Sequence, residues 1–328
     1  MSNTITPREN LERFFRRESV RWMPTHGDIL SFRPRMHPDN YATHLVVDAE
    51  PAPEYDSDVA IGWFGLEWQF VPQAGGATVR PGHPTLTDMS EWEKVISIPD
   101  LDELDWEGSA KINHDYLAAS DKMREVACLS GLWERLISLM DVDNAAIAMI
   151  DEDQQEGVHR FFSAMCDMYD EMIDRYARYY SLDMLMMHDD WGSQRAPFFS
   201  LDTCREMLVP YLKRIVDACH RNGLRFELHC CGKNELLVPA MIEAGVDLWC
   251  GQPMNDFDML TEKYADSCLA FGVLTPVLPE DAAEEELRAA ARAFFDHYKD
   301  RRAIITERRS DPRIIKLVRE ISESYYAS

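Results

Sequence analysis

The stretch FELHCCGKN, residues 226–234, places one histidine next to two cysteines in a chain of 328 residues. It belongs to an apolar run at 224–232 that predicts a β-strand, in which successive side chains point to opposite faces. His229 and Cys231 then share one face, and Cys230 points to the other. An imidazole and a thiolate presented together are good zinc ligands, but a catalytic zinc needs about three protein ligands and an open position. Two ligands do not complete such a site, and buried cysteines without a function are common.

Polar side chains also follow other apolar runs of the sequence. If these runs are parallel strands, their carboxyl ends meet at one edge and their polar residues form a common mouth. An acid taken singly could equally cap a helix or be a solvated loop charge. The residues concerned are His26 near the end of the run at 23–29, His188, Asp189, Asp190 and Trp191 at the end of the run at 182–190, and Trp249, Cys250, Gln252 and Asn255 in and after the run at 246–253.

The elements that must position these residues alternate along the chain. Apolar runs at 23–29, 126–132, 182–190, 224–232, 246–253, 269–275 and 303–307 alternate with helical patterns, among them 200–223, 234–245, 280–300 and 311–326. Alternation of this kind is typical of parallel βα units. No glycine-rich nucleotide-binding motif opens a helix. Within 40–110, which is rich in proline, glycine and aspartate, a strand at 77–82 and a helix at 89–98 are expected.

We predict a (β/α)8 TIM barrel with an N-terminal helical extension and long early loops, and an open doubly wound sheet is the alternative. The chain 1–328 is expected to be one domain, with a helix within 1–20 and the barrel over 21–328. Ser200 is expected to cap the helix at 200–223, with Gly223 after its end.

Composition restricts the partners and the compartment. Lys and Arg number 34 against 58 Asp and Glu, so the formal net charge is −24, which repels nucleic acid and anionic membranes. No apolar run is long enough to span a bilayer, and the first residues lack the apolar core of an export signal, so a cytoplasmic protein is expected. Eight cysteines in a chain of this size are expected to be free thiols or metal ligands.

The segment DDWGSQRAPFFSLDTCREMLVPYLKRIVDACHRNGLRFELHCCGKNELLVPAMIEAGVDLWCGQP resembles the uroporphyrinogen decarboxylase superfamily, specifically its corrinoid-dependent methyltransferase branch. The resemblance is strong over 180–260, weaker towards the C-terminus and diffuse before 120, apart from NLERFFRRESVRWMP. It implies a barrel that holds zinc through H-x-C, here His229 and Cys231, and a third ligand on the last strand, commonly cysteine. No cysteine follows Cys268, so Glu307 in IITERRS stands where that ligand is expected, and Cys250 is the competing third ligand.

The resemblance implies transfer of a methyl group between a small molecule and a corrinoid carried by a partner protein. A carboxylate in place of a thiolate makes a harder zinc ion, which favours an oxygen-bearing donor such as an aryl methyl ether. Transfer from methylcorrinoid to a thiol such as coenzyme M is the alternative. On this view Asp189 or Asp190 and His26 orient substrate or carry a proton; the expected substrate-binding residues are Trp191, Trp249, Gln252 and Asn255.

Three further functions stay open at this point: porphyrinogen decarboxylation, a zinc-dependent hydrolase or lyase reaction, and binding without catalysis. True uroporphyrinogen decarboxylases carry the motif F-R-Q-A-G-R-Y, which grips substrate carboxylates. Arg33 and Arg35 are present here, but the motif is not. Neither the identity of the methyl donor nor the oligomeric state, for which a homodimer is one option, follows from the sequence.

Overall fold

The elements of the chain are described by a computed structural model over residues 5–37, 39–42, 44–51, 59–73 and 75–327. The strands are β1 (Ile29–Arg33), β2 (Val46–Val47), β3 (Glu50–Pro51), β4 (Val59–Ile61), β5 (Glu67–Val71), β6 (Gly76–Val79), β7 (Met123–Cys128), β8 (Met184–His188), β9 (Arg225–Cys230), β10 (Leu248–Gly251), β11 (Ala270–Val273) and β12 (Ala303–Ile305). The α-helices are α1 (Pro7–Phe15), α2 (Trp106–Ala118), α3 (Leu132–Ala148), α4 (Glu152–Tyr180), α5 (Leu201–Met207), α6 (Val209–Arg221), α7 (Val238–Ala244), α8 (Phe257–Lys263), α9 (Glu284–Tyr298) and α10 (Pro312–Tyr326).

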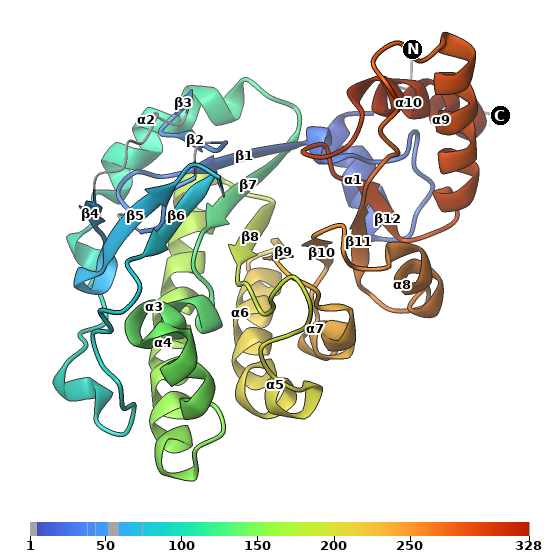
Figure 1. Cartoon of the computed structure of the whole chain (residues 1–328). Coiled ribbons are helices and arrows are strands. Elements are labelled where there is room, and N and C mark those ends of the chain that lie inside the picture. Colours follow the sequence, from blue (N-terminus) through green and yellow to red (C-terminus); the bar gives the residue numbers. More distant parts are fainter. Residues whose placement is uncertain (1–4, 38, 43, 52–58, 74, 328) are drawn as a thin grey trace.

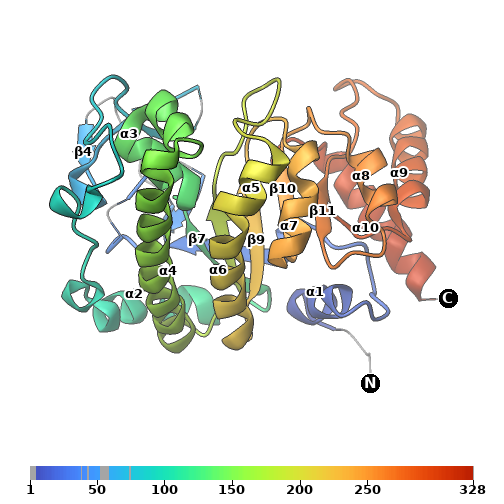
Figure 2. The same ribbon diagram turned by 90° about the horizontal axis from the view of Figure 1, so that it is seen from below.

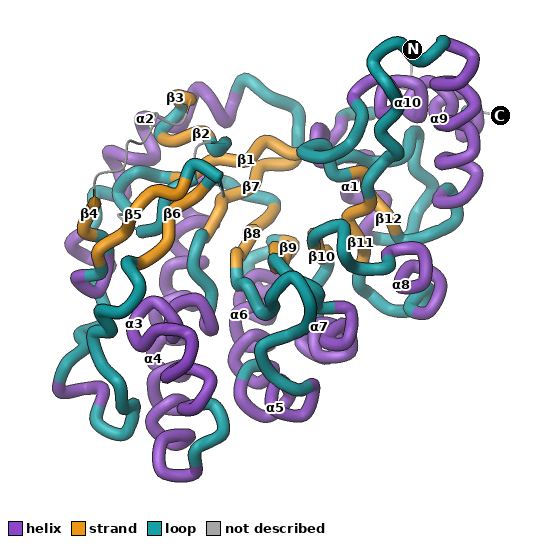
Figure 3. Tube along the Cα trace, in the orientation of Figure 1, coloured by secondary structure: helices purple, strands orange, loops and turns teal. Residues whose placement is uncertain are grey.

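One curled sheet organises the fold, in the order β12-β11-β10-β9-β8-β7-β1-β2-β3. Every neighbouring pair is parallel except β2 with β3. The ends of the sheet meet where Thr25, just before β1, forms a parallel bridge with Ile305 of β12, and the Ile305 N–H donates to the Pro24 carbonyl at 3.0 Å. Helices cover the outside of the curled sheet (Figures 1 and 3). This arrangement confirms the predicted TIM-barrel class.

The strand period of two divides each barrel strand into an outward and an inward face. On β9, Phe226, Leu228 and Cys230 are fully buried in the large core between the sheet and the helices. Glu227 and His229 alternate with them and therefore face the barrel interior. Near the amino ends of the strands the inner face is apolar, and Leu11 and Phe15 of α1 pack against it. Its residues are Ile29, Met123, Met184, Leu248, Cys250, Ala270 and Ile304.

Helix α1 closes the barrel at the amino ends of the strands. Thr6 caps it, with its hydroxyl accepting from the Glu9 N–H at 3.1 Å, and Leu11 and Phe15 pack onto the apolar floor of the barrel. The Arg8 N–H donates to the Asp121 carbonyl, just before β7, at 3.2 Å. Figure 2 shows α1 lying across this end of the molecule. The opposite end, at the carboxyl ends of the strands, is where active sites of this fold lie.

The long early segment carries a structure of its own. Strands β4, β5 and β6 form a small antiparallel sheet beside α3 (Figure 1). Arg135 of α3 holds this segment, because its guanidinium pairs with Asp39 and lies 4.5 Å from the centre of the Phe64 ring. The predicted strand at 77–82 corresponds to β6. The predicted helix at 89–98 was wrong, since only a single 3-10 turn forms there, at Trp92–Lys94.

Several predicted boundaries move for identifiable reasons. The predicted helix at 200–223 is two helices, because Pro210 starts α6 and lacks the N–H that would continue α5. Ser200 caps α5 and Gly223 follows α6 with a φ of +74°, both as predicted. Strand β1 begins at Ile29, because residues His26–Asp28 form a 3-10 turn (η1) inside the run predicted at 23–29. No helix among the described residues is both long and apolar enough to cross a membrane.

Candidate functional site

Four side chains converge at the carboxyl ends of β8 and β9. The ligand atoms of His188, Asp190, His229 and Cys231 all lie within 4.8 Å of one another. The Cys231 Sγ is 3.5 Å from the His229 Nε2, and the His188 Nε2 is 3.5 Å from the Asp190 Oδ1. The two imidazole rings are stacked, with centres 4.9 Å apart. We refer to these four residues as the outer cluster.

Contacts outside the cluster fix the direction of its ligand atoms. The Glu134 Oε2, in the first turn of α3, lies 2.9 Å from the His188 Nδ1. This leaves the His188 Nε2 facing the cluster, which is the arrangement in which a carboxylate orients a metal-binding histidine. The Asp190 Oδ1 accepts from the Cys231 N–H at 2.6 Å, so the two ligand segments are tied together.

The electrostatics of the outer cluster differ between its two histidines. Burial and the neighbouring His188 lower the pKa of His229 to about 3, so His229 is neutral and has a lone pair to offer. Burial would also lower the pKa of His188, but Asp190 and Glu134 raise it well above its ordinary value. Burial raises the pKa of Glu134 to about 8.

Asp189 points away from the outer cluster and caps a helix. Its carboxylate accepts from the Trp133 N–H at 3.3 Å, the Glu134 N–H at 2.8 Å and the Trp191 indole N–H at 2.9 Å. Gly131 leaves room for it, since a Cβ there would lie 2.5 Å from the Asp189 side chain. Asp189 and Trp191, which is fully buried, thus hold the start of α3 against the end of β8.

The loop after β9 is held by two of the predicted substrate-binding residues. The Gln252 Oε1 accepts from the Gly232 N–H at 3.0 Å, and the Asn255 Oδ1 accepts from the Asn234 N–H at 2.7 Å. Gly232 has a φ of +92°, and a Cβ there would lie 2.1 Å from the Gly192 carbonyl oxygen. The remaining predicted contact, Trp249, is fully buried in the outer core.

A second group lies one layer deeper in the barrel and consists of His26, Glu227 and Cys250, whose ligand atoms also lie within 4.8 Å of one another. The His26 Nε2 is 3.1 Å from the Glu227 Oε2 and 3.4 Å from the Cys250 Sγ. Burial would lower the pKa of His26, but Glu227 and Cys250 raise it well above its ordinary value. Burial and Glu227 raise the pKa of Glu125, which lies beside this group, to about 8. We call these three residues the inner cluster.

Glu307 lies in neither cluster. Its side chain is exposed, and its Oε1 accepts from the Thr25 hydroxyl at 3.3 Å. The structure therefore brings His229 and Cys231 together with His188 and Asp190, and it brings Cys250 together with His26. Cys230 points to the outer core, as the strand period predicts, and its Sγ accepts from the Trp191 N–H at 3.2 Å. All eight cysteines are free.

Sequence reasoning did not select His188 as a ligand and did not note Glu134. The signal for His188 is its register, since it pairs directly with His229 across β8 and β9. Two histidines opposite each other on parallel strands point to the same face. Glu134 has no comparable signal in the sequence, because its position depends on how the start of α3 packs against β8.

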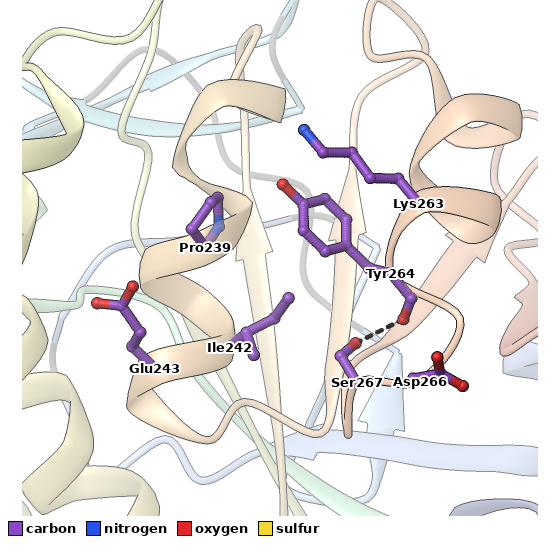
Figure 4. Close-up of a pocket in the computed structure, with 7 residues that line it drawn as sticks. All are labelled: Pro239, Ile242, Glu243, Lys263, Tyr264, Asp266 and Ser267. Carbon is purple, nitrogen blue, oxygen red and sulfur yellow. Dashed lines mark hydrogen bonds between the residues drawn. The ribbon is translucent and has the colours of Figure 1, made fainter.

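Two pockets lie on different sides of the barrel. One of about 450 Å³ lies between the early sheet and α3 and is lined by Glu134, the residue that contacts His188. Its other lining residues include Trp68, Val79, Pro81 and Ile137. The second, of about 350 Å³, lies on the outside between α7 and α8. Figure 4 shows it lined by Pro239, Ile242 and Tyr264, with none of the residues of either cluster. The first pocket is lined by no residue of either cluster, but it shares Glu134, which contacts His188.

Comparisons with known proteins agree with this architecture. The sequence matches the family described as "Uroporphyrinogen decarboxylase (URO-D)" over residues 55–307. No protein with a curated function matches the chain. A methyltransferase from Methanosarcina mazei is similar in structure, with a TM-score of 0.66 and 14% identity over 99% of this chain and 100% of that one. A B12-independent methionine synthase from a Shewanella species has a TM-score of 0.41 and 11% identity over 71% of this chain and 68% of that one.

At 14% identity, the similarity to the Methanosarcina mazei methyltransferase establishes a shared fold. The TM-score of 0.41 to the methionine synthase is too low to support a conclusion. The family match spans most of the barrel, including β7 to β12 and the segment that carries the outer cluster. The chain belongs to the uroporphyrinogen decarboxylase (URO-D) family.

Proposed function

We propose that this protein is a zinc-dependent methyltransferase that moves a methyl group from an aryl methyl ether to the corrinoid of a partner protein. The observation that carries the proposal is the outer cluster, in which two imidazoles, a thiolate and a carboxylate converge at the carboxyl ends of the barrel strands. Active sites of this fold lie at that end. The fold shared with a methyltransferase from Methanosarcina mazei is consistent with the proposal.

The outer cluster fits zinc in its chemistry and its spacing. Zinc takes Cys sulfur, His nitrogen and carboxylate oxygen at 2.0 to 2.3 Å in a tetrahedron, which places neighbouring ligand atoms roughly 3.3 to 3.6 Å apart. The Cys231 Sγ to His229 Nε2 and the His188 Nε2 to Asp190 Oδ1 separations are both 3.5 Å. The His188 and Asp190 side chains retain 22% and 28% exposure, so the site is reachable from the mouth.

Each residue has a role under this proposal. His188, His229 and Cys231 would be the protein ligands, and Glu134 would orient His188. Asp190 would be the weakest ligand, because its Oδ1 is already engaged by the Cys231 N–H. Bound there, zinc would supply Lewis-acid polarisation of the ether oxygen, which makes the leaving phenoxide less basic. His26, predicted to orient substrate or carry a proton, lies outside the outer cluster, and its Nε2 faces Glu227 and Cys250.

Two features favour an oxygen-bearing aromatic donor. The outer cluster contains a single thiolate beside a carboxylate, so the ion would be harder than one held by two thiolates. The pocket of about 450 Å³ that adjoins His188 through Glu134 offers the indole of Trp68 with Val79 and Pro81, which suits an aryl ring.

Porphyrinogen decarboxylation is disfavoured by the arginines near β1. Arg33 is 4% exposed, and its Nη1 donates to the carbonyls of Asp39, at 2.7 Å, and Asn40. Arg35 is exposed and pairs with Asp48 at 3.6 Å. The Arg33 guanidinium therefore hydrogen-bonds to the backbone of the early segment and is not directed at substrate carboxylates.

The first test is metal content. Purified protein should contain zinc, and Cys231→Ser should lose the zinc of the outer cluster, whereas Cys268→Ser, at an exposed thiol away from both clusters, should not. Retention of all the zinc in both Cys231→Ser and His229→Ala would contradict the metal assignment.

The second test is methyl transfer. The zinc protein is mixed with a Co(I) corrinoid protein and a panel of aryl methyl ethers, and the cobalt absorbance is followed. Formation of methyl-Co(III), lost in Cys231→Ser and slowed in Trp68→Ala, is expected. No change with any ether, together with demethylation of methylcobalamin by a thiol, would assign thiol methylation instead. Carbon dioxide release from a porphyrinogen, or metal-dependent ester or amide cleavage without methyl transfer, would overturn the proposal.

A further inference from the structure

The inner cluster gathers its side chains from three separate parts of the barrel. His26 lies in the turn η1 before β1, Glu227 lies on β9 and Cys250 on β10. Their nitrogen, oxygen and sulfur atoms face one another at 3.1 Å, from His26 to Glu227, and at 3.4 Å, from His26 to Cys250. Roughly 3.3 Å for nitrogen to oxygen and 3.5 Å for nitrogen to sulfur are the edges of a tetrahedral zinc site.

Glu125 supplies a second, independent observation at the inner cluster. It is 3% exposed, and its Oε1 accepts from the Ser31 hydroxyl at 2.5 Å, but its Oε2 is buried and has no hydrogen-bond partner. A buried carboxylate oxygen without a hydrogen-bond partner destabilises the fold. Glu125 lies beside Glu227 on the inner face, so two carboxyl groups meet a single imidazole.

The residues around the Cys250 thiol leave space for its sulfur atom and bury it. A Cβ on Gly272 of β11 would lie 2.6 Å from the Cys250 Sγ, so the absence of a side chain there makes room for the sulfur. Cys250 is 3% exposed, Glu227 is 1% exposed, and beneath them lies the apolar floor of the barrel. His26 alone is partly exposed and faces the open side.

We propose that the inner cluster is a second metal site, in which His26, Glu227 and Cys250 bind a divalent ion of the zinc class. Glu227 and the Cys250 thiolate would balance its two positive charges, and the ion would lie on the same inner face as the unpaired Oε2 of Glu125. One nitrogen, one oxygen and one sulfur ligand form a donor set that zinc accepts.

The inner site is distinct from the outer cluster. Glu227 and His229 are two residues apart on β9, which separates the layers by about 6.6 Å along the strand. Metal pairs that share a substrate are about 3.5–4 Å apart. The inner ion is therefore a structural element: it joins η1, at the closing seam of the barrel, to β9 and β10. This role does not depend on methyl transfer.

The test uses Co²⁺ as a spectroscopic probe on metal-free protein. Wild type should bind two equivalents, and Cys231→Ser and Cys250→Ser should each bind one, while Cys268→Ser keeps both. A thiolate-to-cobalt charge-transfer band should persist in Cys231→Ser, where it can come from Cys250, and disappear in the double variant. Zinc should raise the Tm of Cys231→Ser by several degrees and leave that of the double variant unchanged.

The proposal is overturned if wild type binds one equivalent and Cys250→Ser keeps it with an unchanged spectrum. If Cys250→Ser does not fold, Cys231→Ser decides alone, because a missing charge-transfer band in that variant refutes thiolate ligation at the inner site. Failure of the methyl transfer assay leaves these readouts untouched, so the two proposals fail separately.

Discussion

Glu134 contacts His188 and is not itself part of the outer cluster, so it offers a selective test of whether His188 binds metal. Its Oε2 lies 2.9 Å from the His188 Nδ1. Replacing it by glutamine keeps the shape and prevents the side chain from ionising beside His188. Loss of such a supporting carboxylate typically weakens metal binding 10- to 100-fold. We therefore expect Glu134→Gln to weaken zinc binding by about 1.4–2.7 kcal/mol.

The assay is competition for zinc with a chromophoric chelator at fixed pH, in a protein whose inner site has been removed by Cys250→Ser, or in wild type if that variant does not fold. Glu107→Gln is the matched control, since Glu107 occupies the first turn of α2 outside both clusters. It should leave the affinity unchanged. His188→Ala should cost more than Glu134→Gln, because it removes a ligand atom.

Unchanged affinity in Glu134→Gln and in His188→Ala, with loss in His229→Ala and in Glu307→Gln, would refute this reasoning. That result would restore the ligand set His229, Cys231 and Glu307 expected from the family resemblance. The reverse pattern, in which Glu307→Gln has no effect, would remove Glu307 from the site.

Three further predictions concern stability. Gly157→Ala in α4 should destabilise by about 1–3 kcal/mol in urea titrations despite the better helix propensity of alanine, because its Cβ would lie 2.0 Å from the Met89 carbonyl oxygen; a stabilised variant would contradict this. Arg135→Met should cost about 3–5 kcal/mol, since it leaves the carboxylate of Asp39 unpaired; adding Asp39→Asn should recover part of the loss, and no recovery would contradict the pairing. Burial and Arg33 lower the pKa of His37 to about 3, so below pH 6.5 the unfolded chain binds a proton that the folded protein excludes. The free energy of unfolding should therefore fall by about 2 kcal/mol between pH 7 and pH 5 because of His37. The same loss in His37→Gln would refute this.

The barrel could be predicted because its strands are buried on both faces and read as short apolar runs separated by helical patterns. Their boundaries were less predictable. The run at 23–29 predicts a strand, but His26 sits in a turn whose conformation is set by Thr25 and by the closing seam of the barrel. Helix α3 and the long helix α4 were not predicted individually.

The site was predictable only where one strand determines it. The opposite directions of Cys230 and Cys231 follow from the strand period alone. The partnership of His229 with His188 depends on the register between β8 and β9, and that of Cys250 with His26 depends on the closure of the barrel. Both are set by packing between segments far apart in the sequence, which a single sequence does not encode in any local pattern.

Helix α3 connects the residue that orients His188 with a wall of the pocket. Its first turn carries Glu134, which orients His188, and the same helix forms a wall of the pocket through Ile137 and Ser138. Asp189 fastens the start of this helix to the end of β8. Occupancy of the pocket and metal binding at the proposed outer site would thus both act on the first turns of α3. By thermodynamic reciprocity, if the ion changes the affinity for an aromatic ligand by some factor, the ligand changes the affinity for the ion by the same factor.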